Sequence, residues 1–167
     1  MKIEGRARVF GDDVNTDYII SSRRKRETID ESRLTEYLFE GVDPAFAVSV
    51  RPNDVVVAGT NFGCGSAMEV AVTVLQAAGI RAVLSGSFAR SFYRNAINNG
   101  LLAIECDTAT IVEGDSLVVQ LDGPAVQVLI PARDVRLTGA PMAPLTRRIL
   151  ESGGLVEFLR REGRFGS

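Results

Sequence analysis

Three short apolar runs alternate with two helical segments between residues 54 and 105, and this alternation limits the possible folds more than any other feature. The first of them, at residues 54–58, contains a continuous apolar run, which is typical of a strand that is covered on both faces. A strand–helix–strand–helix–strand series implies parallel strands that are joined by helical crossovers. The expected strands are residues 54–58, 82–85 and 101–105, and the expected helices are residues 67–78 and 88–98.

The first 40 residues carry more varied patterns. Residues 2–9 alternate apolar and charged side chains, which predicts a half-buried strand. We expect residues 16–21 to form a short strand or extended segment, and residues 22–27, with four consecutive basic side chains, to form an exposed loop. Residues 30–40 predict a helix, because Asp30 can cap its N-terminus and an apolar stripe follows.

After residue 114 the pattern changes. Residues 116–121 and 126–130 are separated by a turn and predict a hairpin. Residues 145–161 predict a last helix that can break at its paired glycines, Gly153 and Gly154. Because the sequence shows no linker, internal repeat or low-complexity segment, we expect residues 1–167 to form one mixed α/β domain.

Composition excludes several classes of function. The net charge of −2 provides no field to hold nucleic acid, and no apolar run approaches the ~20 residues of a membrane helix. Histidine is absent, so histidine-dependent triads and histidine-ligated metals are excluded. The two cysteines, Cys64 and Cys106, are too few for an iron–sulfur cluster, which needs about four thiolates. We therefore expect this chain to provide no metal ligand, so that any metal chemistry must come from a partner. We also expect the protein to be located in the reducing cytoplasm.

A glycine-rich loop, residues 59–66 (Gly-Thr-Asn-Phe-Gly-Cys-Gly-Ser), joins the first buried strand to the first crossover helix. Its glycines let the backbone approach a ligand, and Ser66 is expected where free amides and the positive end of a helix favour an anion. The loop is not a P-loop, because no Lys-Ser/Thr pair follows its last glycine. It is not a dinucleotide fingerprint either, because its glycines are spaced Gly-x-x-x-Gly-x-Gly. It predicts either a tight connection alone or a carboxylate site centred on Ser66.

Three other groups of polar residues have both a structural and a functional interpretation. Asp17 can cap a turn, or it can orient Ser66 or a bound water. The basic residues 23–26 can form a solvated surface, or they can clamp a carboxylate opposite the loop. Arg90 and Arg94 lie four residues apart on one expected helix face, where we favour a solvated edge or contacts with neighbouring loops.

Together these segments resemble the small subunit of 3-isopropylmalate dehydratase, which is similar to the swivelling domain of the aconitase superfamily. The resemblance runs nearly end to end. Its most specific part combines the loop at residues 59–66 with Ser-Phe-Ala-Arg-Ser-Phe-Tyr-Arg-Asn-Ala-Ile-Asn at residues 87–98. The resemblance implies an α/β fold: a three-layer β/β/α swivelling domain of the aconitase type, with a mostly parallel central sheet, a C-terminal hairpin and a helix.

The resemblance also implies a hydro-lyase that removes water from a 2-alkylmalate and adds it back at the neighbouring carbon. Activity would need a separate large subunit that holds a 4Fe–4S cluster, with one iron open to the small carboxylic acid substrate. In the family the serine after the loop is the base that takes the proton from carbon, and Ser66 matches it. Asp17 matches an aspartate that lines the site, and Arg23 or Arg24 is the nearest counterpart of a substrate-contacting arginine.

The expected site therefore surrounds Ser66. Ser66 and Asp17 are the expected catalytic residues, and the loop amides are expected to bind the substrate anion. The expected substrate-binding residues are Thr16, Arg23, Arg24, Asn61, Gly63, Cys64, Gly65 and Met68.

The sequence departs from the family directly after Ser66. The family motif continues Gly-Ser-Ser-Arg-Glu-His-Ala, whereas this chain has Ala67, Met68 and Val70 in place of the second serine, the arginine and the histidine. In the family this arginine binds a substrate carboxylate and supports the serine alkoxide. Three explanations are open: the chain acts on another substrate, such as a dialkylmalate or homoaconitate; residues 23–26 replace the missing charge; or the chain is a non-catalytic binding or regulatory subunit.

Overall fold

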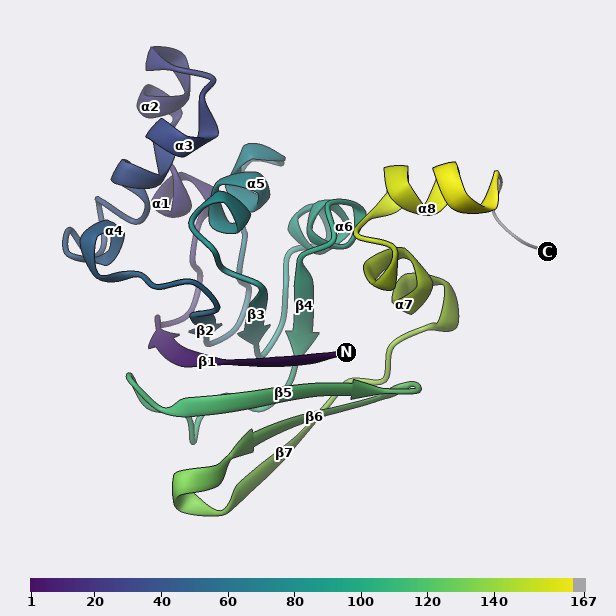
Figure 1. Ribbon diagram of the computed structural model, residues 1–167. Coiled ribbons are helices and arrows are strands. Elements are labelled where there is room, and N and C mark those ends of the chain that lie inside the picture. The colour runs from purple at the N-terminus through teal and green to yellow at the C-terminus, as the bar shows by residue number, and fades with distance from the viewer. Residues whose placement is uncertain (164–167) are drawn as a thin grey trace.

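The computed structural model describes residues 1–163, which form one seven-stranded sheet with helices packed along it (Figure 1). The strands are β1 (Lys2–Val9), β2 (Val55–Ala58), β3 (Ala82–Ser85), β4 (Leu102–Glu105), β5 (Ser116–Asp122), β6 (Ala125–Ile130) and β7 (Val135–Gly139). Their order in the sheet is β4-β3-β2-β1-β5-β6-β7. The three expected crossover strands and the expected hairpin are all present, whereas β7, a half-exposed edge strand, was not predicted.

Strand β1 belongs to both halves of the sheet. Residues 7–9 pair in parallel with residues 55–57 of β2, and residues 2–6 pair antiparallel with residues 116–120 of β5. β2, β3 and β4 extend the parallel half, and β5, β6 and β7 form the antiparallel half. The sheet curls at β1, so that the antiparallel half lies across one face of the parallel half (Figure 1).

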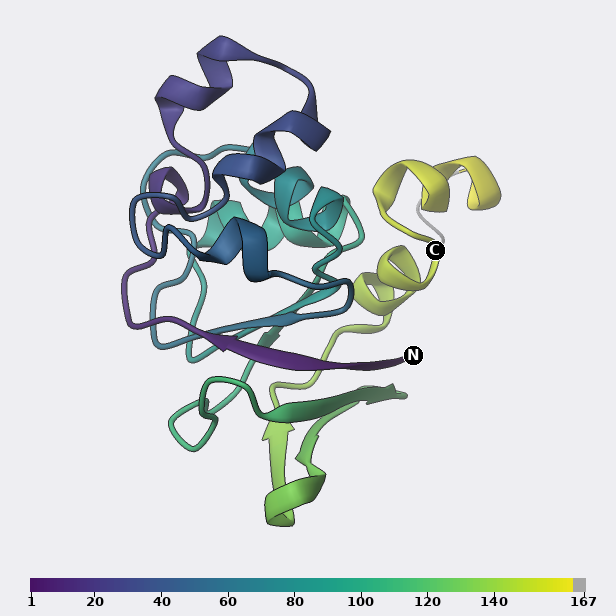
Figure 2. The ribbon, with the colours of Figure 1, turned by 60° about the vertical axis from the view of Figure 1, so that its left-hand side comes forward.

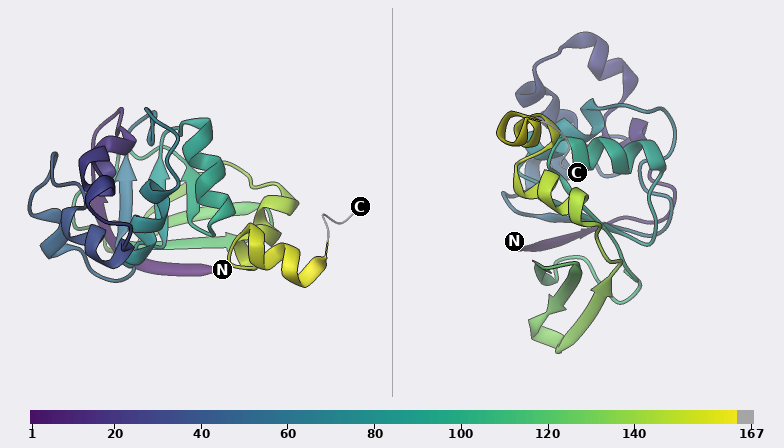
Figure 3. Two further views of the ribbon diagram at one scale, coloured as in Figure 1. Left: turned by 90° about the horizontal axis from the view of Figure 1, so that it is seen from above. Right: turned by 90° about the vertical axis from the view of Figure 1, so that its right-hand side faces the viewer.

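Two apolar cores separate three layers. Side chains of the parallel strands that point one way, such as Val57 and Leu84, pack with Val119 and Val128 of the antiparallel half. The alternate side chains, such as Val83, pack against the helices. Seen from above, the helices cover the parallel strands, and the antiparallel half lies beyond them (Figure 3). This arrangement confirms the predicted three-layer β/β/α fold.

The helices are short. They are α1 (Thr16–Ile19), α2 (Ser22–Glu27), α3 (Glu31–Leu34), α4 (Phe46–Ser49), α5 (Val70–Ala77), α6 (Arg90–Asn98), α7 (Pro144–Glu151) and α8 (Leu155–Glu162), with 3₁₀ turns η1 (Thr35–Tyr37) and η2 (Pro131–Arg133). The expected last helix is broken at Gly153 and Gly154, and both glycines have positive φ. Among residues 1–163, no helix has the length and apolar character needed to cross a membrane.

Helices α1 and α2 contradict the sequence prediction, which expected an extended segment and a loop. Asn15 caps α1 by accepting a hydrogen bond from the Asp17 amide at 2.9 Å, and Ser21 caps α2 by accepting from the Arg24 amide at 3.4 Å. These caps provide hydrogen bonds for amides that a short helix leaves unpaired. In α1 this stabilisation outweighs the β-propensity of residues 16–21. As a result α2 and α3 form an arch that projects above the rest of the helical layer (Figure 2).

Candidate functional site

Three loops meet at the carboxyl ends of the parallel strands. An isolated bridge between Asn15 and Cys64 joins the segment after β1 to the glycine-rich loop after β2. A second bridge joins Phe62 of that loop to Phe88, which follows β3. Open α/β sheets bind ligands outside the carboxyl ends of their strands. The glycine-rich loop therefore lies at the edge where a ligand site is expected.

Two glycines of this loop are required by its geometry. Gly63 has a φ of +79°, and a Cβ atom on it would lie 2.2 Å from Cγ of Phe92. Gly65 has a φ of +89°, and a Cβ atom on it would lie 2.5 Å from Oδ1 of Asn15. A side chain at either position would strain the backbone and push against a neighbouring segment. The two glycines thus allow the loop to pack closely between α6 and the start of α1.

The loop amides differ in their availability to a ligand. The Gly63 amide donates to the Val14 carbonyl at 2.8 Å, so it is not the open anion donor that we expected. Cys64 is engaged by its bridge with Asn15, and its carbonyl accepts from the Thr16 amide at 2.8 Å. The exposed amides of Gly65 and Ser66 have no hydrogen-bond partner within residues 1–163. Of the expected donors, Gly65 is available, and Ser66 adds a second.

Ser66 is held by its backbone and lies outside helix α5. The buried Thr16 hydroxyl donates to the Ser66 carbonyl at 2.9 Å. In a helix that began at Ala67, this carbonyl would accept from the amide of Val70. In this structure the Thr16 hydroxyl occupies that carbonyl and α5 begins only at Val70, so the predicted helix start at Ala67 is wrong. The expected position of Ser66 at a helix mouth is therefore not found, and Thr16 has a positioning role that the sequence did not reveal.

Asp17 lies one residue after Thr16, but its carboxylate points to α2. Its Oδ1 atom accepts from the Ser22 hydroxyl at 2.6 Å and from the Ser22 amide at 3.1 Å. Within residues 1–163 it makes no hydrogen bond to Ser66. The contact by which Asp17 was expected to orient Ser66 is thus absent, and Asp17 instead fixes the start of α2 beside the loop.

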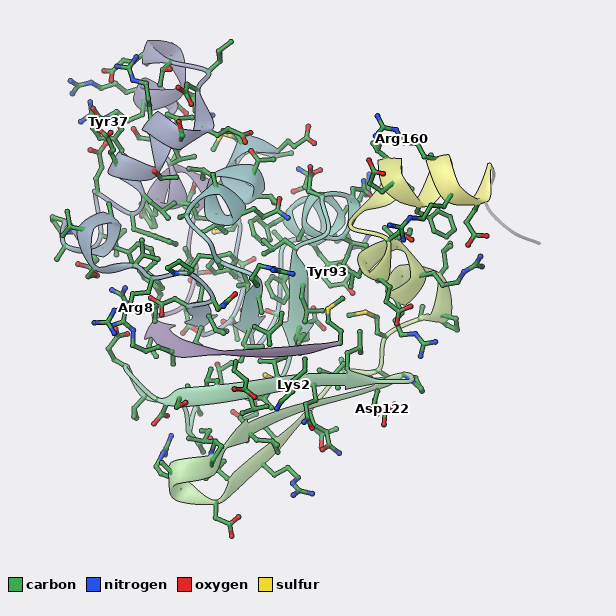
Figure 4. All side chains as sticks on the ribbon, viewed as in Figure 1. Lys2, Arg8, Tyr37, Tyr93, Asp122 and Arg160 are labelled. Atoms are coloured by element: carbon green, nitrogen blue, oxygen red, sulfur yellow. The ribbon has the colours of Figure 1, made fainter. Side chains whose placement is uncertain are left out.

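The two arginines that were expected to clamp a carboxylate are paired within the protein. Arg24 donates to both carboxylate oxygens of Glu40 at 2.9 Å, and its guanidinium lies 3.8 Å from the centre of the Tyr37 ring. Figure 4 shows Tyr37 beside the arch of α2 and α3, far from the C-terminal helices. Arg23 is exposed and pairs with Glu27 at 3.2 Å. Arg24 therefore holds α2 against η1 and is not free for a substrate in this structure.

The pairing of Arg24 predicts an acid-sensitive contact. The Arg24 guanidinium lowers the pKa of Glu40 below its ordinary value of 4.5. A carboxylate whose folded-state pKa is lowered stabilises the folded state above its unfolded-state pKa, and this contribution is lost as the pH falls through the folded-state pKa. We expect the Arg24 Nε–Hε NMR resonance to titrate with a midpoint below pH 4.5, and the titration to become smaller in Glu40→Gln, where Glu27 is the remaining carboxylate that pairs with Arg24. A midpoint at or above 4.5 would contradict the contact.

The other expected side chains connect the loop to its surroundings. Asn61 donates from Nδ2 to Oδ1 of Asp13 at 2.7 Å, which links the loops after β1 and β2. Met68 is half-buried against the helix-side core, and its Sδ atom contacts Nζ of Lys25 in α2. Lys25 was noticed only as part of a basic run. If that run had been interpreted as a helix, the side chain of Lys25 would have been expected to point in a different direction from those of Arg23 and Arg24, because successive residues of a helix face different sides.

Arg90 and Arg94 lie apart from this cluster of loops. Both side chains are exposed, which agrees with the expected basic edge. They line a surface pocket of about 430 Å³ together with Tyr93 and Glu105. Figure 4 shows Tyr93 between α6 and α7.

Comparison with known proteins identifies the class. The model of the aconitase C-terminal domain matches residues 14–109, which contain the end of the loop after β1 and the loops after β2 and β3. A crystal structure of 3-isopropylmalate dehydratase from Methanocaldococcus jannaschii superimposes with a TM-score of 0.92 at 43% identity, covering 98% of this chain and 96% of that chain. The fold is therefore that of the aconitase C-terminal domain.

Curated relatives define the family within this class. A 3-isopropylmalate dehydratase small subunit of Methanopyrus kandleri is 47% identical over 96% of this chain and 94% of its own length. A methanogen homoaconitase small subunit of Methanocaldococcus jannaschii is 44% identical over 96% of this chain and 93% of its own length. The chain belongs to the family of 3-isopropylmalate dehydratase small subunits, and it is a subunit of an aconitase-type hydro-lyase. The small-subunit family implies a large-subunit partner.

The aconitase family also implies a 4Fe–4S cluster, which the described residues do not fit. Within residues 1–163, no group of three or more histidine, cysteine or acidic residues could hold a metal ion. Cys106 is buried, and burial raises the pKa of its thiol to about 11, whereas a cluster ligand is a thiolate. The loops described above therefore offer anion contacts and a serine, and no cluster ligands.

Proposed function

We propose that this small subunit and a cluster-bearing large subunit together dehydrate and rehydrate a 2-alkylmalate-type acid. The names of the relatives support this class of substrate, and they include both 3-isopropylmalate dehydratase and homoaconitase small subunits. On this proposal the large subunit holds the 4Fe–4S cluster and faces the glycine-rich loop, and residues 1–167 are a single swivelling domain. The free thiols of Cys64 and Cys106 suit a reducing cytoplasm.

One observation carries the assignment of Ser66 as the base. Its carbonyl is fixed by Thr16, while its exposed hydroxyl has no hydrogen-bond partner within residues 1–163. A reactive hydroxyl must be held in place by its backbone and remain open to the substrate. The open amides of Gly65 and Ser66 can stabilise negative charge beside that hydroxyl.

The chemistry assigned to this chain is a proton transfer at carbon. The Ser66 alkoxide takes the proton from the carbon next to the one that carries the hydroxyl group. The electron pair of the broken C–H bond forms the double bond, and the hydroxyl group leaves from the neighbouring carbon as hydroxide, for which the cluster of the large subunit would supply a Lewis acid. Hydration in the reverse sense, with the two carbons exchanged, gives the isomeric acid. Gly65 and Ser66 hold a substrate carboxylate through their amides during both steps.

Turnover by the assembled enzyme tests this proposal. The chain would be co-produced anaerobically with its large subunit, the cluster rebuilt, and the ultraviolet absorbance of the new double bond followed. The panel would contain 3-isopropylmalate, citramalate, homocitrate and a dialkylmalate. We expect one of these acids to be dehydrated. If a stable, cluster-loaded complex turns over none of them, the proposed substrate class is wrong, and a non-catalytic subunit becomes the better interpretation.

A further inference from the structure

Helix α6 separates two parts of the molecule. An α-helix has 3.6 residues per turn, so Arg90 and Arg94 lie on one side of α6 and Phe92 lies on the opposite side. Phe92 packs against Gly63 of the glycine-rich loop. The side with the arginines faces α7 and the end of β4, where it lines the pocket of about 430 Å³. This pocket is therefore separate from the candidate site at the glycine-rich loop.

A second pocket, of about 280 Å³, adjoins the first, because Tyr93 and Glu105 line both. It lies along the edge strand β4, and its other side chains are apolar, of which Ile104 and Met142 are buried. The Glu105 carbonyl accepts from the Ala140 amide at 2.7 Å, which fixes the segment between β7 and α7 as one wall. The two pockets together, here called the α6 groove, have a basic half and an apolar half.

The charged side chains of the α6 groove have no partners among the described residues. Within residues 1–163, Arg90, Arg94 and Glu105 make no ion pair or side-chain hydrogen bond, although all three line the same pocket. The arginines of the neighbouring α7, Arg147 and Arg148, both pair with glutamates. Two arginines one helical turn apart can hold a carboxylate between them, and a carboxylate can hold an ammonium group. The groove thus offers positions for both charges of a zwitterion.

Tyr93 lies where the two halves of the groove meet, between α6 and α7 (Figure 4). Its side chain is half-buried, and its hydroxyl makes no hydrogen bond within residues 1–163. Burial and, to a smaller extent, the negative charge of Glu105 raise the pKa of this hydroxyl. The hydroxyl therefore stays protonated at neutral pH and is a free donor for a ligand in the groove.

We propose that the α6 groove binds an α-amino acid with an apolar side chain. Arg90 and Arg94 bind its carboxylate, Glu105 binds its ammonium group, and its side chain lies beside Met142 in the apolar half. The acids of the hydro-lyase fit this groove poorly, because their second carboxylate would lie beside Glu105. An acidic segment of a partner protein would likewise leave Glu105 unpaired, and burying an unpaired charge is costly.

Isothermal titration calorimetry of the assembled enzyme with L-norleucine tests this inference. Norleucine supplies both charges and an unbranched apolar side chain, whereas hexanoate lacks the ammonium group and pentylamine lacks the carboxylate. We expect norleucine to bind at least about tenfold more tightly than either, since a charged hydrogen bond contributes that much to affinity. If norleucine binds no more tightly than hexanoate, the ammonium group is not recognised and the inference is wrong.

Variants of the groove place the bound amino acid. We expect Arg94→Gln and Glu105→Gln each to weaken norleucine binding about 10- to 100-fold. The matched controls are Arg136→Gln and Glu36→Gln, which change exposed residues of the same types outside the groove and should bind norleucine as the wild type does. Equal affinity of all four variants would overturn the inference.

The same titration of the small subunit alone separates the amino acid from a protein partner. We expect the affinity for norleucine to be the same in the small subunit and in the assembled enzyme. Binding to the small subunit that is lost on assembly would show that the large subunit covers the groove, and would overturn the inference. Because these titrations do not depend on turnover, an enzyme that dehydrates none of the acids above would refute the proposed function alone.

Discussion

Replacement of Ser66 by alanine is expected to lower kcat of the assembled enzyme about 10³-fold and to leave KM nearly unchanged. General acid–base catalysis contributes about 10²–10⁴-fold to enzyme rates, and here the hydroxyl is the group that takes the proton. The loop should keep its shape, because the contact that fixes it runs from Thr16 to the Ser66 carbonyl and does not use the hydroxyl. Rates of dehydration would be measured with the cluster content of each complex held equal.

The control for this substitution is Ser116→Ala. Ser116 is also exposed, but it lies at the start of β5, where β1 pairs with it. Its replacement should change neither kcat nor complex formation. If Ser66→Ala keeps more than about a tenth of the wild-type rate, another group removes the proton, because general-base loss costs at least about 10²-fold.

Replacement of Gly63 by alanine is expected to reduce the free energy of unfolding by about 2–5 kcal/mol. A left-handed backbone costs a residue with a side chain about 1–2 kcal/mol, and overpacking a core typically adds about 1–3 kcal/mol. The new Cβ atom would lie 2.2 Å from Cγ of Phe92, which is 2% exposed and cannot move into solvent. Urea unfolding, followed by far-ultraviolet circular dichroism, would give the change.

Gly41→Ala is the matched control for this prediction. A Cβ atom on Gly41 would have no neighbour within 4 Å, and its backbone is not in the left-handed region. The same substitution should therefore leave stability unchanged or raise it slightly, by up to about 1 kcal/mol, because alanine restricts the unfolded chain. Equal stability of Gly63→Ala and Gly41→Ala would show that the loop is not packed against α6 as described.

The parallel half of the fold could be predicted because local and tertiary preferences agree there. β2 and β3 are buried on both faces, so their sequences are apolar apart from Ser85 at the end of β3. α1 and α2 were missed because caps and side-chain pairs, such as Arg23 with Glu27, determine them. β7 was missed because an edge strand buries little, although Val135 and Leu137 alternate with polar residues.

The candidate site was predictable as a loop but not as a set of contacts. The glycine spacing indicated a close backbone approach, and the structure shows it at Gly63 and Gly65. Hydrogen bonds between distant segments leave no trace in a single sequence, so the pairing of Thr16 with Ser66 could not be derived. For the same reason Arg24 was expected in the site, although Glu40, 16 residues away, engages it.

The central claim is that Ser66 of this chain takes a proton from substrate carbon. The most direct measurement is the incorporation of deuterium from D₂O into substrate, observed by NMR, for the assembled wild-type enzyme and for Ser66→Ala. We predict that the wild type introduces deuterium at the carbon next to the hydroxyl-bearing carbon, and that Ser66→Ala introduces none above the rate without enzyme. Equal incorporation by the two enzymes would contradict the claim.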